Sequence, residues 1–170
     1  QDTLSVFDTR SDQISETVCA RQNPADLFGA QPNALAFDAS GRRLFVCNGT
    51  QNAVALFDLK PGKSRLLGLI PVGWFPGAVA YDPAREAVYV ANIKGIGSTR
   101  HLAPGEAVKF NSHQHFGTLS LVRLPKKREL PRLTQIALAN LRYGLLREAR
   151  RPARPNQPPR PVPERVGEPS

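Results

Sequence analysis

Short runs of the chain alternate apolar residues with small or polar ones. Leu35 and Phe37 alternate in this way, and Leu44 and Val46 follow the same pattern. Because successive side chains of a strand point to opposite faces, this period of two predicts pleated strands. The residues between the two strands, 38–41, read Asp-Ala-Ser-Gly, in which the aspartate can accept backbone hydrogen bonds and the glycine tolerates a positive φ.

The same pattern occurs twice, at an offset of 44 residues. PNALAFDASGRRLFVCN begins at Pro32 and aligns without a gap with PGAVAYDPAREAVYVAN, which begins at Pro76. A repeat of about 40–50 residues that is rich in short strands is typical of a β-propeller blade. The predicted fold class is therefore all-β, an incomplete β-propeller with a Pro/Arg-rich C-terminal linker.

A further strand closes each repeat. NAVALFD occupies residues 52–58, GTLSLVRL occupies residues 117–124, and the related TLSVFD opens the chain. The spacing of these strands places a 21-residue insertion in the second repeat, over about residues 94–116. We expect about two and a half four-stranded blades within residues 1–139, with a complete blade over about 32–72 and an enlarged blade over about 76–139.

This number of blades predicts an incomplete ring. Propellers have about four to eight blades, and each sheet covers the apolar face of the next. The chain also contains no methionine. We therefore expect a fragment of a longer protein; the alternatives are an artificial sequence and a self-associating half-propeller.

The net charge of +9 belongs mainly to the C-terminal part of the chain. Residues 123–170 contain 12 basic and 4 acidic residues, whereas residues 1–122 contain 11 basic and 10 acidic residues. Seven of the 16 prolines lie in residues 151–170. This composition predicts an extended linker, partly in the polyproline II conformation. Binding of nucleic acid or anionic lipid is the alternative, but no aromatic residues are interleaved with the cations, so no nucleic-acid partner is expected.

Two elements are expected between the blades and the linker. Residues 133–139 would supply the missing outer strand of the enlarged blade. Residues 140–150 carry Leu141, Leu145 and Ala149 at helical spacing, with arginines near the end, where cations suit the helix dipole. This pattern predicts a short helix; the alternative is the start of the linker.

Few residues are suited to catalysis or metal binding. His113 and His115 are two residues apart in the insertion, with His101 nearby, and would share a face of a strand as a metal pair. Exposed loop histidines are the alternative, because no Cys or carboxylate cluster completes the set. Cys19 and Cys47 are expected to be reduced, buried thiols. No catalytic motif or cofactor site is evident, and no stretch is long enough to span a membrane.

Two five-residue sequences resemble a motif of a known family. LFVCN at residues 44–48 and VYVAN at residues 88–92, with their upstream Pro-x-Ala and the 44-residue spacing, resemble the YVTN-type β-propeller repeat. VGWFP from Val72, VANIKG from Val90 and GTLS from Gly117 resemble the last propeller blades of bacterial two-domain proteins. In those proteins a YVTN-type propeller precedes a phosphoesterase domain of the alkaline phosphatase superfamily, and PERVGEPS at the end of this chain resembles the linker between them.

The resemblance implies a non-catalytic role for these residues. In such proteins the Asp and His ligands of a divalent metal, and the Thr or Ser nucleophile, belong to the downstream domain, so no catalytic residue carries over to this chain. The expected partners are that domain and the remaining blades, and the expected location is periplasmic or extracellular. The insertion is the candidate contact with the phosphoesterase domain, with Lys94, Gly95, His101 and Phe116 as its residues; a tolerated surface loop is the alternative.

These observations and the resemblance leave three candidate functions. The chain is expected to be the propeller portion of a metal-dependent phosphoesterase, acting as a scaffold or as a docking platform for substrate or domain. The first alternative is a stand-alone binding or scaffold propeller of the cell envelope. The second is a subunit of a cofactor-dependent dehydrogenase, for which no cofactor ligands stand out.

Overall fold

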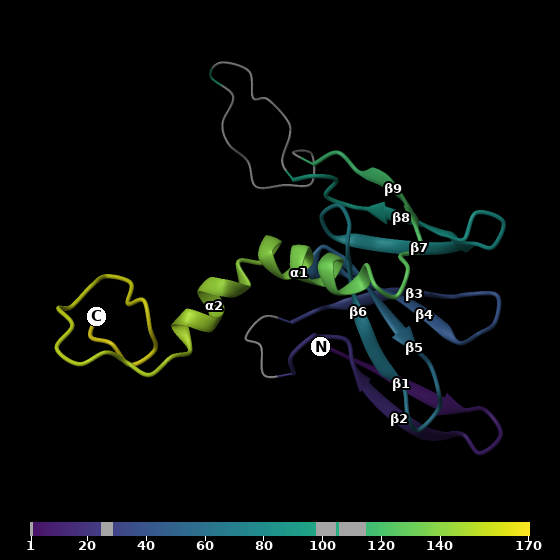
Figure 1. Cartoon of the computed structure of the whole chain (residues 1–170), viewed down its shortest axis with the longest axis horizontal. Helices are drawn as coiled ribbons and strands as arrows, with labels where there is room; N and C mark the ends of the chain where they lie inside the picture. Colours follow the sequence, from purple (N-terminus) through teal and green to yellow (C-terminus); the bar gives the residue numbers. More distant parts are fainter. Residues whose placement is uncertain (1, 25–28, 98–104, 106–114) are drawn as a thin grey trace. The chain divides into compact units, whose positions relative to one another are not determined.

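The computed structural model describes residues 2–24, 29–97, 105 and 115–170. The chain divides into two compact units, Gln1–Ala137 and Leu138–Ser170. The first unit consists mainly of three antiparallel sheets, in which each strand pairs with its neighbour in sequence (Figure 1). The predicted all-β class is confirmed at this level, and no helix of the described residues is long and apolar enough to cross a membrane.

The first sheet contains two strands and the second contains four. In the first sheet, β1 (Thr3–Asp8) pairs with β2 (Gln13–Cys19). The second sheet has the order β3-β4-β5-β6. Its strands are β3 (Pro32–Phe37), β4 (Arg43–Asn48), β5 (Ala53–Asp58) and β6 (Arg65–Pro71). The 3-10 turn η1 (Gly49–Gln51) lies between β4 and β5.

The third sheet has the order β7-β8-β9, formed by β7 (Pro76–Asp82), β8 (Ala87–Asn92) and β9 (Thr118–Arg123). Its first two strands pair in the same register as β3 and β4, since Pro32 is opposite Asn48 and Pro76 is opposite Asn92. An irregularity follows the proline in both sheets. The 44-residue offset in sequence therefore corresponds to the same local backbone pairing.

Aspartate side chains organise the first turn of both repeats, as the sequence predicts. Asp38 Oδ1 accepts hydrogen bonds from the backbone N–H groups of Arg42 and Arg43, each at 3.1 Å. Asp82 Oδ1 accepts from Ala84 and Arg85 at 2.9 and 3.1 Å. Burial acts to raise the pKa of Asp38, but the hydrogen bonds from the backbone of Arg43 and from Ser40 outweigh it and hold that pKa below its ordinary value.

The main core of the first unit lies between the second and third sheets. It contains one face of the second sheet, which we call its front face: Ala34, Phe45, Cys47, Val54, Leu56 and Ile70. These residues pack against the back face of the third sheet: Val79, Tyr81, Val88, Val90 and Val122. The Phe45 and Tyr81 rings stack with their centroids 5.8 Å apart. Burial of both faces explains why the central residues of β4 and β5, 44–47 and 53–57, are apolar.

The first and second sheets are joined by buried and exposed polar contacts. Asn48 Nδ2 donates to the carbonyl oxygen of Ala20 at 2.8 Å and to Gln51 Oε1 at 2.9 Å, and the Asn48 side chain is buried. The Glu16 carboxylate accepts hydrogen bonds from the backbone N–H groups of Gly62 and Ser64. These contacts connect the turns of the second sheet to β2 and to the residue that follows it.

The expected outer strand over residues 133–139 is wrong, because these residues lie in helix α1 (Leu130–Asn140). Pro131 falls in the first turn, where a missing N–H costs no helical hydrogen bond. Leu130, Thr134 and Ala137 are buried at a spacing of three or four residues, which is the helical period. The short apolar run fits either element by periodicity alone, and its contacts with β6 decide for the helix.

Helix α1 packs closely on β6 at a glycine. A Cβ atom added to Gly68 would lie 2.5 Å from Thr134 Oγ1 and 2.8 Å from Leu130 Cγ. The Thr134 hydroxyl accepts a hydrogen bond from the Leu69 N–H at 2.9 Å and donates to the Leu130 carbonyl at 2.9 Å. The helix thus satisfies a backbone donor on the outer strand of the second sheet and covers part of that strand's edge.

The second unit contains helix α2 (Tyr143–Ala149), within the 140–150 segment for which the sequence predicts a short helix. The Pro-rich segment after it does not run extended as expected. The backbone N–H of Val166 donates to the Ala149 carbonyl at 3.0 Å, and that of Arg160 donates to the Pro169 carbonyl at 3.2 Å. The segment therefore turns back toward α2.

An arginine fork holds this segment together. Arg154 donates to both carboxylate oxygens of Glu168, from Nε at 2.7 Å and from Nη2 at 3.0 Å, and it also donates to Glu164 at 2.8 Å. Arg165 bridges to Glu148 of α2 at 2.6 Å. Bidentate pairing is among the stronger forms of ion pair, which explains how a segment without an apolar core adopts a folded path.

We expect the folded path of residues 151–170 to be lost in acid. The hydrogen bond from Arg154 holds the pKa of Glu168 at about 2, below the ordinary 4.5. A carboxyl group whose pKa is lowered by folding stabilises the fold fully above its unfolded pKa, and this contribution falls as the pH drops from about 4.5 to about 2. A carbon-13 NMR titration of the Glu168 carboxyl should give a midpoint near 2, and Arg154→Gln should raise it toward 4.5. A wild-type midpoint near 4.5 would contradict the ion pair.

Candidate functional site

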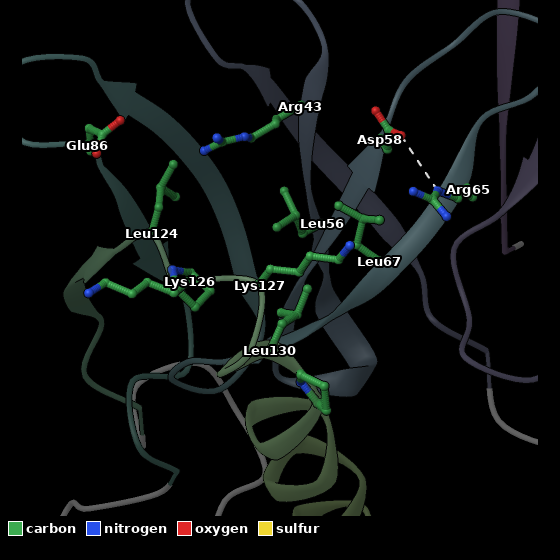
Figure 2. A pocket seen from close by; sticks show the side chains of 12 residues that line it. Arg43, Leu56, Asp58, Arg65, Leu67, Glu86, Leu124, Lys126, Lys127 and Leu130 are labelled. Atoms are coloured by element: carbon green, nitrogen blue, oxygen red, sulfur yellow. Dashed lines mark ion pairs between the residues drawn. The ribbon is translucent and has the colours of Figure 1, made fainter.

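A pocket of about 550 Å³ lies where the second and third sheets meet the chain before α1. Its apolar lining consists of Leu56, Leu67, Leu124, Pro125, Leu130 and Pro131. Its charged lining consists of Arg43, Asp58, Arg65, Glu86, Lys126 and Lys127. The volume lies within the range of small-molecule and peptide-side-chain pockets. Figure 2 shows Arg43 and Lys127 approaching the pocket from opposite sides, with Leu56 between them in this view.

The sheet register places one row of charges at the edge of this pocket. Arg43 on β4 is opposite Asp58 on β5, and Asp58 is opposite Arg65 on β6. Asp58 also lies 3.3 Å from Lys60 Nζ and 3.5 Å from Arg65 Nε. Burial acts to raise the pKa of Asp58, but the hydrogen bond and charge of Lys60, together with Arg42 and Arg65, lower it overall. Asp58 therefore stays ionised and neutralises part of the row.

The segment between β9 and α1 forms the other wall. Its path is set by two hydrogen bonds: the Leu124 N–H donates to the Glu86 carbonyl at 2.8 Å, and the Lys126 N–H donates to Glu129 Oε2 at 2.8 Å. In the part of the chain that the structure describes, neither Lys126 nor Lys127 forms an ion pair. The wall thus presents two uncompensated ammonium groups beside apolar Leu124 and Leu130, an arrangement suited to an anion that carries an apolar body.

Neither cysteine lines this pocket. Within the described ranges, no group of three or more His, Cys, Asp or Glu residues is placed to hold a metal ion. Both cysteines are free; Cys19 is half-buried and Cys47 is buried, and burial raises the pKa of the Cys47 thiol to about 12. A thiol with that pKa is protonated at neutral pH and is a poor nucleophile.

The predicted pair of metal-binding histidines, His113 and His115, stays a prediction. His113 and His101 lie outside the described residues. His115 is half-buried, and its Nδ1 atom has no hydrogen-bond partner among the residues described. One histidine does not form a metal site without further ligands.

The described residues of the predicted contact loop gather at the base of the insertion. Gly95 has a φ of +58°, and a Cβ atom there would lie 2.0 Å from the Phe116 carbonyl oxygen, so the two ends of the insertion meet at a glycine. The Lys94 ammonium lies 5.1 Å from the centroid of the Phe75 ring, within cation–π range. Four exposed apolar side chains lie around this base, and we call them the insertion-base patch: Trp74, Ile93, Ile96 and Phe116.

The pocket itself was not predicted from the sequence. Its charges lie on three strands, on the turn between β7 and β8, and on a segment about 60 residues beyond β6. The register of β4, β5 and β6 follows from the strand pattern, and it aligns the Arg43-Asp58-Arg65 row. The position of residues 124–131 depends on the packing of α1 against Gly68. In the sequence, the only indication of this close approach is a glycine inside a strand.

The described residues thus define a mostly β chain with a cationic, apolar-lined pocket beside two packed sheets. No family model matches the chain, and no curated protein matches it. Among solved structures, it is similar to Kuenenia stuttgartiensis hydrazine synthase, with 24% sequence identity, a TM-score of 0.44 and coverage of 54% of this chain. The match spans 23% of the length of that protein chain. A likeness of this size does not extend to function.

Proposed function

We propose that this chain is a β-propeller segment of the YVTN type that serves as the scaffold and docking platform of a two-domain, metal-dependent phosphoesterase. One observation carries the propeller part of this proposal. The front face of the second sheet is buried against the third sheet, whereas the equivalent front face of the third sheet is exposed. Its residues are Ala78, Ala80, Tyr89, Ala91, Leu119 and Leu121, of which Tyr89 is half-buried and the others are exposed.

This exposed face has the chemistry of a surface that another sheet covers. Leu119 and Leu121 are 69% and 54% exposed, although the equivalent residues Val54 and Leu56 are buried in the core. On the second sheet, Leu35 and Phe37 are 54% and 49% exposed on the back face. Apolar faces of this kind are stabilised when further repeats of the same type stack on them, which is the arrangement of a propeller.

The docking role is supported by the insertion-base patch. Ile93, Ile96 and Phe116 each expose more than half of their surface, and Lys94 adds a cation beside them. A contiguous exposed apolar patch with a polar rim favours a protein contact. The resemblance of residues 72–125 and 163–170 to two-domain proteins supports the remaining parts of the proposal. These are the phosphoesterase domain, its divalent metal and a periplasmic or extracellular location.

The test has two parts. The gene on both sides of these codons should encode further repeats of about 44 residues and, after residue 170, a set of Asp and His ligands with a Ser or Thr nucleophile. The purified 170-residue chain should not hydrolyse p-nitrophenyl phosphate above the blank with added zinc, manganese or magnesium. Metal-dependent turnover by this chain would contradict the assignment of catalysis to another domain.

A stand-alone binding propeller of the cell envelope is the second candidate. The pocket with Lys126 and Lys127 favours it, because two unpaired cations beside an apolar lining suit a bound anion without any second domain. A gene that encodes further repeats but no metal-ligand set would support this candidate over the phosphoesterase.

A further inference from the structure

The third sheet differs from the other two at its outer edge. In the first and second sheets, the strands β1 and β5 each pair with an outer antiparallel strand, β2 or β6. Strand β9 holds the equivalent place in the third sheet, and no strand of the described ranges pairs with its outer side. Such an edge presents a row of backbone N–H and C=O groups, which is a template for pairing with another extended segment.

A groove of about 590 Å³ lies beside the end of this strand. Its apolar lining comes from three elements: Val122 of β9, Ile70 and Pro71 of β6, Leu133 of α1, and the intervening Leu124 and Pro125. Because Ser120 and Val122 point toward the second sheet, side chains on the same face of an added strand would enter this groove. The groove therefore offers a place for alternate apolar side chains.

Three arginines give the groove a strong positive charge. Arg123, Arg128 and Arg132 line it, are exposed, and form no ion pair within the described part of the chain. The one carboxylate of the lining, Glu129, accepts the hydrogen bond from the Lys126 N–H. Cations without partners beside a strand edge favour an acidic segment over a neutral or basic one.

We propose that β9 accepts an extended acidic peptide segment as an antiparallel fourth strand. Backbone hydrogen bonds to β9 supply the pairing, and apolar side chains on the face toward the second sheet enter the groove over Val122, Ile70 and Leu133. The N-terminal end of an antiparallel segment lies beside the C-terminal end of β9, where its carboxylates meet Arg123, Arg128 and Arg132. A nucleic acid fits less well, because its phosphates accept but do not donate hydrogen bonds and so cannot pair with the C=O groups of the β9 edge. Phosphates also gain nothing from the apolar part of the lining. The inference depends on the β9 edge alone and is independent of the phosphoesterase assignment.

Fluorescence anisotropy with labelled peptides tests the chemistry of the occupant. The 170-residue chain should bind an eight-residue glutamate-valine peptide with three glutamates at its N-terminal end, followed by alternating valine and serine. It should bind the lysine-valine counterpart, and an acidic peptide of the same charge with central prolines, at least about tenfold more weakly. Equal binding of the proline-containing peptide, or of an eight-nucleotide oligothymidylate, would overturn strand addition.

Charge variants locate the site. The triple variant Arg123→Gln, Arg128→Gln, Arg132→Gln should lose about tenfold in affinity, as expected for three exposed ion pairs. A matched variant with the same change in charge, Arg10→Gln, Lys63→Gln, Arg147→Gln, should bind as the unmodified chain does. Equal loss in both variants would show a long-range effect of net charge and would overturn the groove as the site.

Amide exchange measured by NMR separates pairing from simple charge attraction. On binding of the glutamate-valine peptide, alternate amide protons of β9 should become more slowly exchanging, because only every second N–H of a strand points to its outer side. The Leu69 amide, which donates to Thr134 Oγ1, reports whether α1 still packs on β6 in each variant. Binding without new protection in β9 would overturn the proposal.

Discussion

Replacing Phe45 with alanine should lower the free energy of unfolding by about 3–5 kcal/mol, the usual cost of truncating a large aromatic residue in a core. Phe45 is fully buried, lies on the front face of the second sheet, and stacks on Tyr81 of the third sheet. The substitution removes both the buried ring and the contact that joins the two sheets. Urea unfolding followed by circular dichroism would measure the change.

Phe37 provides the matched control within the same sheet. It belongs to the neighbouring strand but lies on the back face, where 49% of its surface is exposed. Phe37→Ala should cost about 1 kcal/mol or less, because less apolar surface returns to water. Equal destabilisation by the two variants would contradict the packing of the front face. In a protein with further repeats, the proposed propeller would place a neighbouring sheet over this ring. Phe37→Ala would then lower the free energy of unfolding as well.

Replacing Gly68 with valine should destabilise the first unit by about 3 kcal/mol, at the upper end of the usual cost of overpacking. The Cβ atom alone would lie within 2.5 Å of Thr134 Oγ1 and 2.8 Å of Leu130 Cγ, so α1 would have to move away from β6. That movement also breaks the hydrogen bond from the Leu69 N–H to Thr134. For a chain of this size the melting temperature should fall by about 6–12 °C in a calorimetric scan.

Gly144 is the control for this prediction. It lies in helix α2, and a Cβ atom there would meet nothing within 4 Å. Gly144→Ala should therefore leave the melting temperature unchanged or raise it slightly, because alanine favours a helix over glycine. An unchanged melting temperature for Gly68→Val would show that α1 does not pack on β6 as described.

Much of the local structure was predictable because it depends on neighbouring residues. The period of two at Leu35, Phe37, Leu44 and Val46 predicts strands, and these residues lie in β3 and β4. The Asp38 turn was also predictable, since an aspartate side chain reaches backbone N–H groups only a few residues away. The 44-residue offset implies that any local feature of one repeat recurs in the other, and the matching register of β7 and β8 agrees with this.

The errors concern segments whose conformation depends on distant partners. Residues 133–139 have an apolar pattern short enough for a strand or a helix, and the contact with Gly68, about 65 residues earlier, selects the helix. The Pro-rich segment has the composition of an extended linker, but Arg154 pairs with Glu168 and turns it back. Ion-pair partners 14 residues apart in a segment without periodicity leave no pattern that predicts the pairing.

The residues alone thus establish the strands, their turns and the repeat, because each depends on side-chain alternation and on hydrogen bonds within a few positions. The packing of sheets and helix decides which apolar faces are buried. It also brings Arg43, Asp58 and Lys127 to one pocket, and Arg123 and Arg132 to one groove. Strand pairing and helix packing set these positions over long separations in the chain, and the alternation of residues along one strand contains no information about them.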